Sequence, residues 1–563
     1  MLFTTISVLL WLLFFQALGN VPLLRHSPKN PFLAVWLGFF TAAFMSLCIS
    51  IWLPLDSGAA RLIIGLAALP GVMPTIRSWR GIIVDFKGRL LLPCIMGFGL
   101  ILLAQGFVSC FAATGYDTDL YHQQIVRWLR EYGIVPGLGN LHSRLAQTSG
   151  WLALAAFMEW GPFTARTAFI LPSLWLLAAL LYFSYCACRA QCAQQRMYAL
   201  CLLFLCGLHL KTLYPNLYYD RAALLLYSIM ISEMLPVFFL PLAGRPLLRQ
   251  LTLLFILLAA SILFKPIAVP SLFFALILLV VLLRKNMIPI SALPRILWLP
   301  ALTAALWCVL NAIQSGYPFF PLAVFPLPFE WTMRPEAIDG LRRAVQGWAR
   351  WPGSGYGKAL DAGLAYWLGP WLERNLANKM FIAGVAVPFI AGCAFWLAAF
   401  RRSDCLRAKL FFFLLSLAHL IYWFFQHPDS RFGLELFWTW AALGMACTLT
   451  PVRIKTILRV KGVPLALALA ACLALAQTIA PLSSKEKRRA LHPLQMPPRH
   501  TPFPGVRARI LHAGTPQAFT LFLPPENEDR CGNSPLPCAP YPNENLSLRT
   551  PGNLGDGFRL KAF

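Results

Sequence analysis

Long, continuously apolar runs separated by short polar segments recur along the whole chain. Each run is long enough to cross a bilayer as a helix, and the absence of apolar–polar alternation argues against a β-barrel. The pattern predicts an all-α polytopic membrane protein. We expect about fourteen transmembrane helices, at residues 2–19, 31–53, 59–73, 90–110, 163–186, 197–213, 222–242, 251–264, 267–283, 297–313, 380–400, 410–425, 432–449 and 464–480.

The apolar stretch over 251–283 is too long for one simple span, and Lys265 and Pro266 interrupt it at its centre. Basic loops flank both of its ends, so an even number of crossings fits best. We therefore predict two short helices that meet at an outward Lys-Pro turn. Broken helices of this kind often line binding cavities.

Polar segments divide the chain into a multi-spanning domain at 1–480 and a Pro-rich tail at 481–563. Two outward loops, 114–150 and 314–379, exceed ordinary length; the second contains amphipathic stretches that suit interfacial helices. The tail is too small for a large core. Cys531 and Cys538 stand alone in its polar sequence, which predicts a disulfide and an oxidising compartment.

Charge supports a membrane protein and indicates its orientation. Charged residues make up 12% of the 563 residues, against about 25% in soluble chains. The net charge of +26 comes mostly from short loops on one side of the predicted helices, which makes that side cytoplasmic and argues against nucleic-acid binding. In a bacterial inner membrane, both termini would then be extracytoplasmic. The basic residues at 485–489 argue against an outward tail, whereas the cysteine pair supports it.

The first long outward loop carries the densest polar set. Asp117 and Asp119 form an Asp-x-Asp pair beside His122. Two such carboxylates can share a divalent metal such as Mg or Mn, or one of them can act as a general base. The alternative is a helix N-cap with Asp119 in the first turn. The sequence favours neither interpretation.

The glycine-rich stretch 135–144, VPGLGNLHSR, follows in the same loop. Its glycines allow a tight path on which backbone N–H groups could approach an anion. His142 and Arg144 would add donors to a phosphate. The alternative is a plain turn that leads into a helix.

Four further candidates lie at predicted outward helix ends: Asp220, Lys265, His427 and Arg431. Lys265 is nearly isolated in apolar sequence, and an ionisable group near membrane depth is a functional candidate unless it snorkels to the interface. Arg431 could bind a phosphate. The alternatives are local: Asp220 would pair with its neighbour Arg221, and Arg431 with a nearby aspartate.

These features together resemble the type C (GT-C) membrane glycosyltransferases, which use polyprenyl-phosphate-linked sugars outside the cytoplasm. The resemblance rests on many spans, an acidic pair in the first large outward loop and a later outward acid. It implies that Asp117 or Asp119 is the catalytic acid residue of that loop and that Asp220 corresponds to the second acid of many members. The segments GYDTDLYH at 115–122 and VPGLGNLHSR at 135–144 are also similar to functionally uncharacterised bacterial multi-spanning proteins.

We therefore expect inverting glycosyl transfer from a lipid-linked sugar donor to a saccharide, lipid or protein acceptor. Lys265, Arg144 and Arg431 would bind the lipid phosphate, with His122, His142, Asp220 and His427 nearby. The alternatives are a transporter or flippase, or a polymerase or ligase, for lipid-linked saccharides. Internal repeats, which are common in transporters, are not evident.

Overall fold

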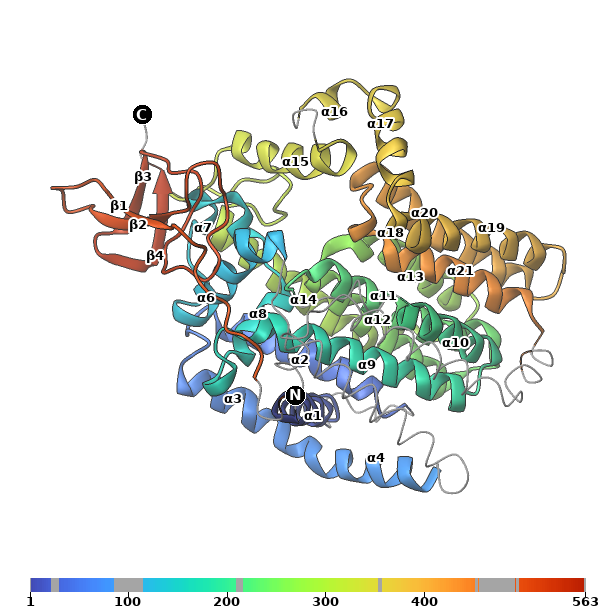
Figure 1. Cartoon of the computed structure of the whole chain (residues 1–563). Coiled ribbons are helices and arrows are strands. Elements are labelled where there is room, and N and C mark those ends of the chain that lie inside the picture. The colour runs from blue at the N-terminus through green and yellow to red at the C-terminus, as the bar shows by residue number, and fades with distance from the viewer. Residues whose placement is uncertain are drawn as a thin grey trace.

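The computed structural model describes residues 2–21, 30–85, 115–208, 216–352, 357–450, 454, 492 and 496–560. Within these ranges the chain is mostly helical, with small sheets near its C-terminus (Figure 1). Nine of the described helical segments are long and apolar enough to cross a membrane, which makes the chain a multi-pass membrane protein. The predicted spans 90–110 and 464–480 lie outside the described residues.

The first half of the membrane domain contains α1 (Leu2–Gly19), α2 (Leu33–Ile49), α3 (Gly58–Ala68), α4 (Val72–Asp85), α6 (Gln123–Glu131), α7 (Leu138–Leu141), α8 (Gly150–Met158), α9 (Thr167–Arg189), α10 (Ala193–Leu208) and α11 (Tyr219–Phe239). The second half contains α12 (Gly244–Phe264), α13 (Val269–Arg284), α14 (Leu293–Ser315), α15 (Pro335–Arg350), α16 (Lys358–Asp361), α17 (Leu364–Leu376), α18 (Lys379–Phe381), α19 (Val387–Phe400), α20 (Leu406–Gln426) and α21 (Leu434–Thr448).

Helix pairs α1–α2, α9–α10, α11–α12 and α19–α21 pack along one another. Small residues permit a close approach of α1 and α2. A Cβ at Gly19 would lie 1.7 Å from the carbonyl oxygen of Ala34, and one at Gly38 would lie 1.7 Å from that of Phe15. Close packing through small residues is a common way to join helices in a bilayer, where burial of apolar surface provides little driving force.

The chain breaks between α12 and α13 at Lys265, as the sequence analysis predicts. Pro266 disfavours the α conformation in the preceding residue, and Lys265 is extended, with φ −157° and ψ 136°. A short 3-10 turn, Pro266–Ala268, then leads into α13. Because Lys265 is not part of either helix, its side chain can point toward α11.

The tail contains strands that the sequence analysis did not predict. Strand β1 (Arg507–Leu511) pairs antiparallel with β2 (Phe519–Leu523), and β3 (Leu546–Thr550) pairs antiparallel with β4 (Asn553–Leu560). A Pro-Gly turn connects β3 and β4, with Gly552 at φ +76°, the conformation that a type II turn requires. The tail is thus a small β domain, which lies beside α6 and α7 in Figure 1.

The tail domain docks on the glycine-rich stretch of the first outward loop. The N–H of Phe558 donates to the carbonyl of Pro136 at 3.0 Å. A Cβ at Gly137 would meet the Phe558 carbonyl oxygen at 2.1 Å, and one at Gly557 would meet the Pro136 carbonyl oxygen at 2.0 Å. These glycines therefore let two backbones touch, and the Gly137 N–H donates to Ile313. The tail lies on the same side of the membrane domain as this loop.

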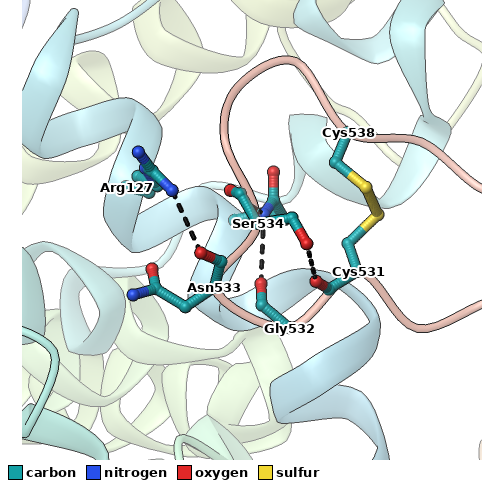
Figure 2. The surroundings of a disulfide bond; sticks show 7 residues. Arg127, Cys531, Gly532, Asn533, Ser534 and Cys538 are labelled. Atoms are coloured by element: carbon teal, nitrogen blue, oxygen red, sulfur yellow. Dashed lines mark hydrogen bonds between the residues drawn. A yellow bond between two sulfur atoms is a disulfide. The ribbon is translucent and has the colours of Figure 1, made fainter. Parts of the chain in front are cut away.

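Cys531 and Cys538 form a disulfide across seven positions of sequence. Figure 2 shows the loop that it closes, with Arg127 of α6 donating to the carbonyl of Asn533 at 3.0 Å. Gln124 of α6 donates to the carbonyls of Gly532 and Ser534, so the disulfide loop is held against the first outward loop by polar contacts.

Replacement of Cys538 by Ser should loosen the tail domain. A loop of this length loses about 2–3 kcal/mol of chain-entropy stabilisation when its crosslink is removed. We expect faster cleavage within the tail during limited proteolysis, while the membrane domain stays protected. Cys405→Ser is the matched control, because that thiol is free and exposed. Equal cleavage rates in both variants would contradict a structural role of the disulfide.

Candidate functional site

The first outward loop begins with a π-helical turn, Thr118–His122, that continues into α6. The Thr118 hydroxyl accepts a hydrogen bond from the N–H of Leu217 at 3.0 Å, which ties this turn to the start of α11. Turns of the π type often occur at functional sites. Asp117 precedes the turn but makes no side-chain cap hydrogen bond, so its carboxylate is directed elsewhere.

The Asp117 carboxylate meets two guanidinium groups from distant parts of the chain. Its Oδ2 lies 2.8 Å from Nη2 of Arg431, and its Oδ1 lies 3.9 Å from Nη1 of Arg144. The Asp117 side chain is 10% exposed. Guanidinium groups contact such a partly buried carboxylate through charge-assisted interactions.

Arg431 lies against aromatic faces as well as a carboxylate. Its guanidinium carbon is 4.7 Å from the ring centroid of Tyr218 and 4.5 Å from that of Phe432. Burial disfavours its charged form, but Asp117 and Asp220 outweigh burial and raise its pKa above the ordinary value. The neighbouring Asp429 carboxylate instead accepts from the backbone N–H of Arg431, at 2.9 Å.

Lys265 forms an ion pair with Asp220, at the start of α11. Asp220 is 3% exposed, and the ammonium nitrogen of Lys265 lies 4.4 Å from the ring centroid of Phe432. The proline-induced break thus supplies the cation that this buried acid needs. Arg221, the chain neighbour of Asp220, interacts electrostatically with Glu435 of α21.

His122 interacts electrostatically with members of both ion pairs. It is 1% exposed, and neither ring nitrogen has a hydrogen-bond partner among the described residues. Burial lowers its pKa well below the ordinary value, so the ring is neutral at physiological pH. Tyr121 and Tyr219 flank it, their hydroxyls 3.1 Å apart. A neutral imidazole without partners can still donate or accept a hydrogen bond.

We call the following six residues the polar cluster: Asp117, His122, Arg144, Asp220, Lys265 and Arg431. They come from the first outward loop, the start of α11, the break before α13 and the turn before α21. Three cations face two carboxylates around a neutral histidine, which leaves one positive charge within the set. Such a set suits an additional anion, for which guanidinium groups offer directed N–H donors.

The other candidates lie at the edge of the polar cluster or away from it. His427 contacts the Phe432 ring and is electrostatically coupled to Lys265, and burial lowers its pKa to about 3. His142 lies 6.0 Å, centroid to centroid, from Tyr541 of the tail; burial likewise lowers its pKa to about 3. Both rings are therefore neutral at physiological pH.

Asp119 faces the tail domain instead of the polar cluster. Its Oδ1 lies 2.7 Å from Nε2 of His500, although the two groups are not aligned for a hydrogen bond. The backbone carbonyl of Asp119 accepts from the N–H of Gly532 at 2.7 Å. The two acids of the Asp-x-Asp pair thus have separate surroundings, one in the polar cluster and one at the tail domain.

These surroundings do not suit a metal ion shared by Asp117 and Asp119. Arginine side chains contact the carboxylate of Asp117, and His500 of the tail domain contacts that of Asp119. Among the residues that the structure describes, no group of three or more His, Cys, Asp and Glu side chains could hold a metal.

Sequence reasoning missed the aromatic and tail residues of this region. Tyr121, Tyr218 and Tyr219 supply ring faces and hydroxyls to the polar cluster, and their crowding in two short motifs was the available signal. His500 had no such signal, because an isolated histidine in a Pro-rich segment carries no pattern. Its position follows only from the docking of the tail.

A family model described as "Domain of unknown function (DUF8201)" matches residues 1–438 of the chain. The match includes all six residues of the polar cluster and ends before the tail. Comparisons with curated proteins and with solved structures found no similar protein.

Proposed function

We propose that this protein, which belongs to the DUF8201 family, is a glycosyltransferase. It would transfer a glycosyl group from a lipid-phosphate-linked donor to an acceptor at the extracytoplasmic face of the membrane. The observation that carries this proposal is the polar cluster. Three cations from widely separated segments meet two carboxylates beside aromatic faces, at one end of a membrane-spanning helix bundle.

The excess positive charge supports a phosphate-bearing substrate. Arg431 and Arg144 could exchange the Asp117 carboxylate for phosphate oxygens, which arginine binds through paired N–H groups. Lys265 would remain paired with Asp220 and add a positive potential. Val269 and Phe273 of α13, the helix that follows the Lys265 break, are exposed apolar side chains that would meet lipid, so a lipid-linked phosphate could reach the cluster from the bilayer.

The same exchange would activate Asp117. Once phosphate binds the arginines, the freed carboxylate accepts the proton of the acceptor hydroxyl. The acceptor oxygen then forms a bond to the anomeric carbon, and the bond from that carbon to the phosphate oxygen breaks. The leaving phosphate keeps the bonding electron pair, and Arg431 and Arg144 stabilise its charge. This direct displacement inverts the anomeric configuration.

The two acids of the motif receive different roles in this proposal. Asp117 is the base, because it alone of the two faces the arginines. Asp119 is a positioning residue for the tail, through His500 and the backbone of Gly532. The disulfide loop would then keep the first outward loop in place above the membrane domain.

A transfer assay tests the function. Purified protein in detergent should release decaprenyl phosphate from decaprenyl-phosphate sugars when a cell-envelope extract supplies the acceptor. An enzyme makes a stoichiometric glycosylated product in detergent, whereas a transporter or flippase makes none. Absence of product with glucose, galactose, mannose and N-acetylglucosamine donors would refute the proposal.

Replacement of Arg431 by Gln should weaken the binding of decaprenyl phosphate by roughly 10–100-fold, because a hydrogen bond to a charged group contributes about 1.5–3 kcal/mol. Equilibrium binding of the labelled lipid to protein in nanodiscs measures this. The control is Arg343→Gln on α15, whose guanidinium pairs with Asp339 and Asp361 at an exposed position. Equal loss in both variants would argue against a phosphate site at Arg431.

A further inference from the structure

The segment that follows α14 is apolar and exposed. It comprises residues 316–329, GYPFFPLAVFPLPF, which we call the apolar loop. Its exposed large side chains are Phe319, Leu322, Val324, Phe325 and Phe329, and Phe325 is 73% exposed. Burial of a Leu or Phe side chain is worth about 1.5–3 kcal/mol. Several such side chains exposed on one loop therefore indicate a surface that contacts a membrane or a partner.

The apolar loop continues an uncharged stretch that begins inside the membrane domain. No charged residue interrupts the sequence between Arg295, near the start of α14, and Glu330. The helical segment Ile290–Ser315 is long and apolar enough to cross a membrane, and Val309 on it is exposed. Val309 lies about 9 Å along the helix axis from Ser315. A side chain that would face lipid thus lies close to the start of the loop.

The backbone of the apolar loop presents few N–H groups to its surroundings. Residues 318, 321, 326 and 328 are prolines, which have no N–H. The N–H groups of Phe320, Leu322, Leu327 and Phe329 donate to carbonyls within the loop. An unpaired N–H is costly in a bilayer, because water is not there to accept from it. The backbone of this loop therefore suits lipid.

The apolar loop ends at charged contacts with the tail domain. Glu330 follows it directly, and the Glu330 carboxylate oxygens lie 2.7 Å from Nε of Arg549 and 2.6 Å from Nη1 of Arg559. The Arg549 guanidinium carbon also lies 4.4 Å from the ring centroid of Trp331. The charged end of the segment is thus bound by the tail, whereas the uncharged part is left exposed. Such a division between polar and apolar surfaces is typical of segments that lie at a membrane interface.

We infer that the apolar loop inserts into the lipid leaflet on the side of the membrane that carries the tail domain. Phe319, Leu322 and Phe325 would lie at the boundary between headgroups and acyl chains. Interfacial segments bury their apolar face about 5–10 Å into that boundary. Through Glu330, the inserted loop would also hold the tail domain close to the membrane surface. Insertion would take place whatever reaction the polar cluster performs.

Fluorescence quenching by lipids tests the insertion. The fluorescent amino acid dansylalanine takes the place of Phe325 in the full chain. The protein is placed in phosphatidylcholine nanodiscs, with or without lipids that carry a doxyl quencher on the upper part of the acyl chain. Emission from position 325 should fall by a fraction similar to that from position 309, where Val309 of α14 is replaced as the membrane-embedded reference.

The matched control for the label is position 510. Ile510 is an exposed apolar residue of β1 in the tail domain, so a label there has the same kind of neighbourhood but no contact with lipid. Its emission should stay unchanged when quencher lipids are added. Both Phe325 and Ile510 are exposed, so neither replacement removes packing from the core.

A charge on the apolar loop should withdraw it from lipid. With dansylalanine in place of Leu322, the further replacement Phe325→Glu should abolish most of the quenching, because a carboxylate is costly to transfer out of water. Ile510→Glu is the control; it adds the same charge to the tail domain and should leave quenching at position 322 unchanged. Equal quenching in both variants would contradict insertion driven by the apolar side chains.

The other outcomes also decide the matter. Unquenched emission at position 325 together with strong quenching at position 309 would overturn the inference. Emission at position 325 that is unquenched by lipid but shifts to the blue as the protein concentration rises in detergent would assign the loop to contact with a second copy of the chain, which overturns it as well. Quenching at position 510 as strong as at position 325 would show that lipid contact is not specific to this loop.

Discussion

Replacement of Asp117 by Asn should reduce glycosyl transfer by about 10²–10⁴-fold, the usual contribution of a general base. Asn keeps the size of the side chain and its ability to accept a hydrogen bond from Arg431, but it cannot take the acceptor proton. Binding of decaprenyl phosphate should persist, because the arginines remain in place. Initial rates of product formation at saturating donor measure the effect.

Asp119→Asn is the matched control for this prediction. It alters the neighbouring acid of the same motif, which faces His500 instead of the arginines. We expect transfer within about tenfold of the wild type, with faster proteolysis of the tail domain. Wild-type rates in the Asp117 variant would eliminate Asp117 as the base. A loss confined to the Asp119 variant would reverse the two roles.

Replacement of Lys265 by Met should destabilise the protein by about 3–5 kcal/mol, because it leaves the buried Asp220 carboxylate without its cation. The Asp220 side chain is 4% exposed, and that of Lys265 is 18% exposed, so water cannot fully replace the ammonium group. Equilibrium unfolding in mixed micelles, followed by far-ultraviolet circular dichroism, measures the free energy of unfolding.

The double variant Asp220→Asn with Lys265→Met distinguishes the effect of an unpaired buried charge from the effect of lost side-chain packing. It removes both charges together, so no buried charge is left without a partner, and most of the lost stability should return. A double variant as unstable as Lys265→Met alone would show that the ion pair is not the cause. Lys285→Met is the single-site control, because that lysine is exposed at the far end of α13.

The helices could be predicted because their signal is local. Apolar runs long enough to cross a bilayer gave the positions of the described spans, and the Lys265-Pro266 step gave the break between α12 and α13. Proline disfavours the α conformation in the residue before it. Pro172, Pro236 and Pro300 nevertheless lie inside helices, so it was the charge of Lys265 in an apolar run together with Pro266 that indicated a break. The strands of the tail were missed because each is short and only partly alternating.

The partners of the charged residues could not be predicted, because local and distant pairs compete. The sequence allowed Asp220 to pair with Arg221 and Arg431 with Asp429. In the structure, Asp220 pairs with Lys265, and the guanidinium of Arg431 pairs with Asp117. The Asp429 carboxylate accepts a hydrogen bond from the backbone N–H of Arg431. Both distant pairs form where packed helices exclude water, so each acid needs a cation close by.

By itself, the sequence determined that this chain crosses a membrane many times, where its helix breaks, and which loops hold its polar residues, since these follow from hydrophobicity and backbone stereochemistry along short stretches. Only the tertiary structure decided that Asp117 joins the arginines while Asp119 joins the tail. Although the two acids are two positions apart, they point to different surroundings, and Arg431 and His500 each lie more than three hundred positions away in sequence.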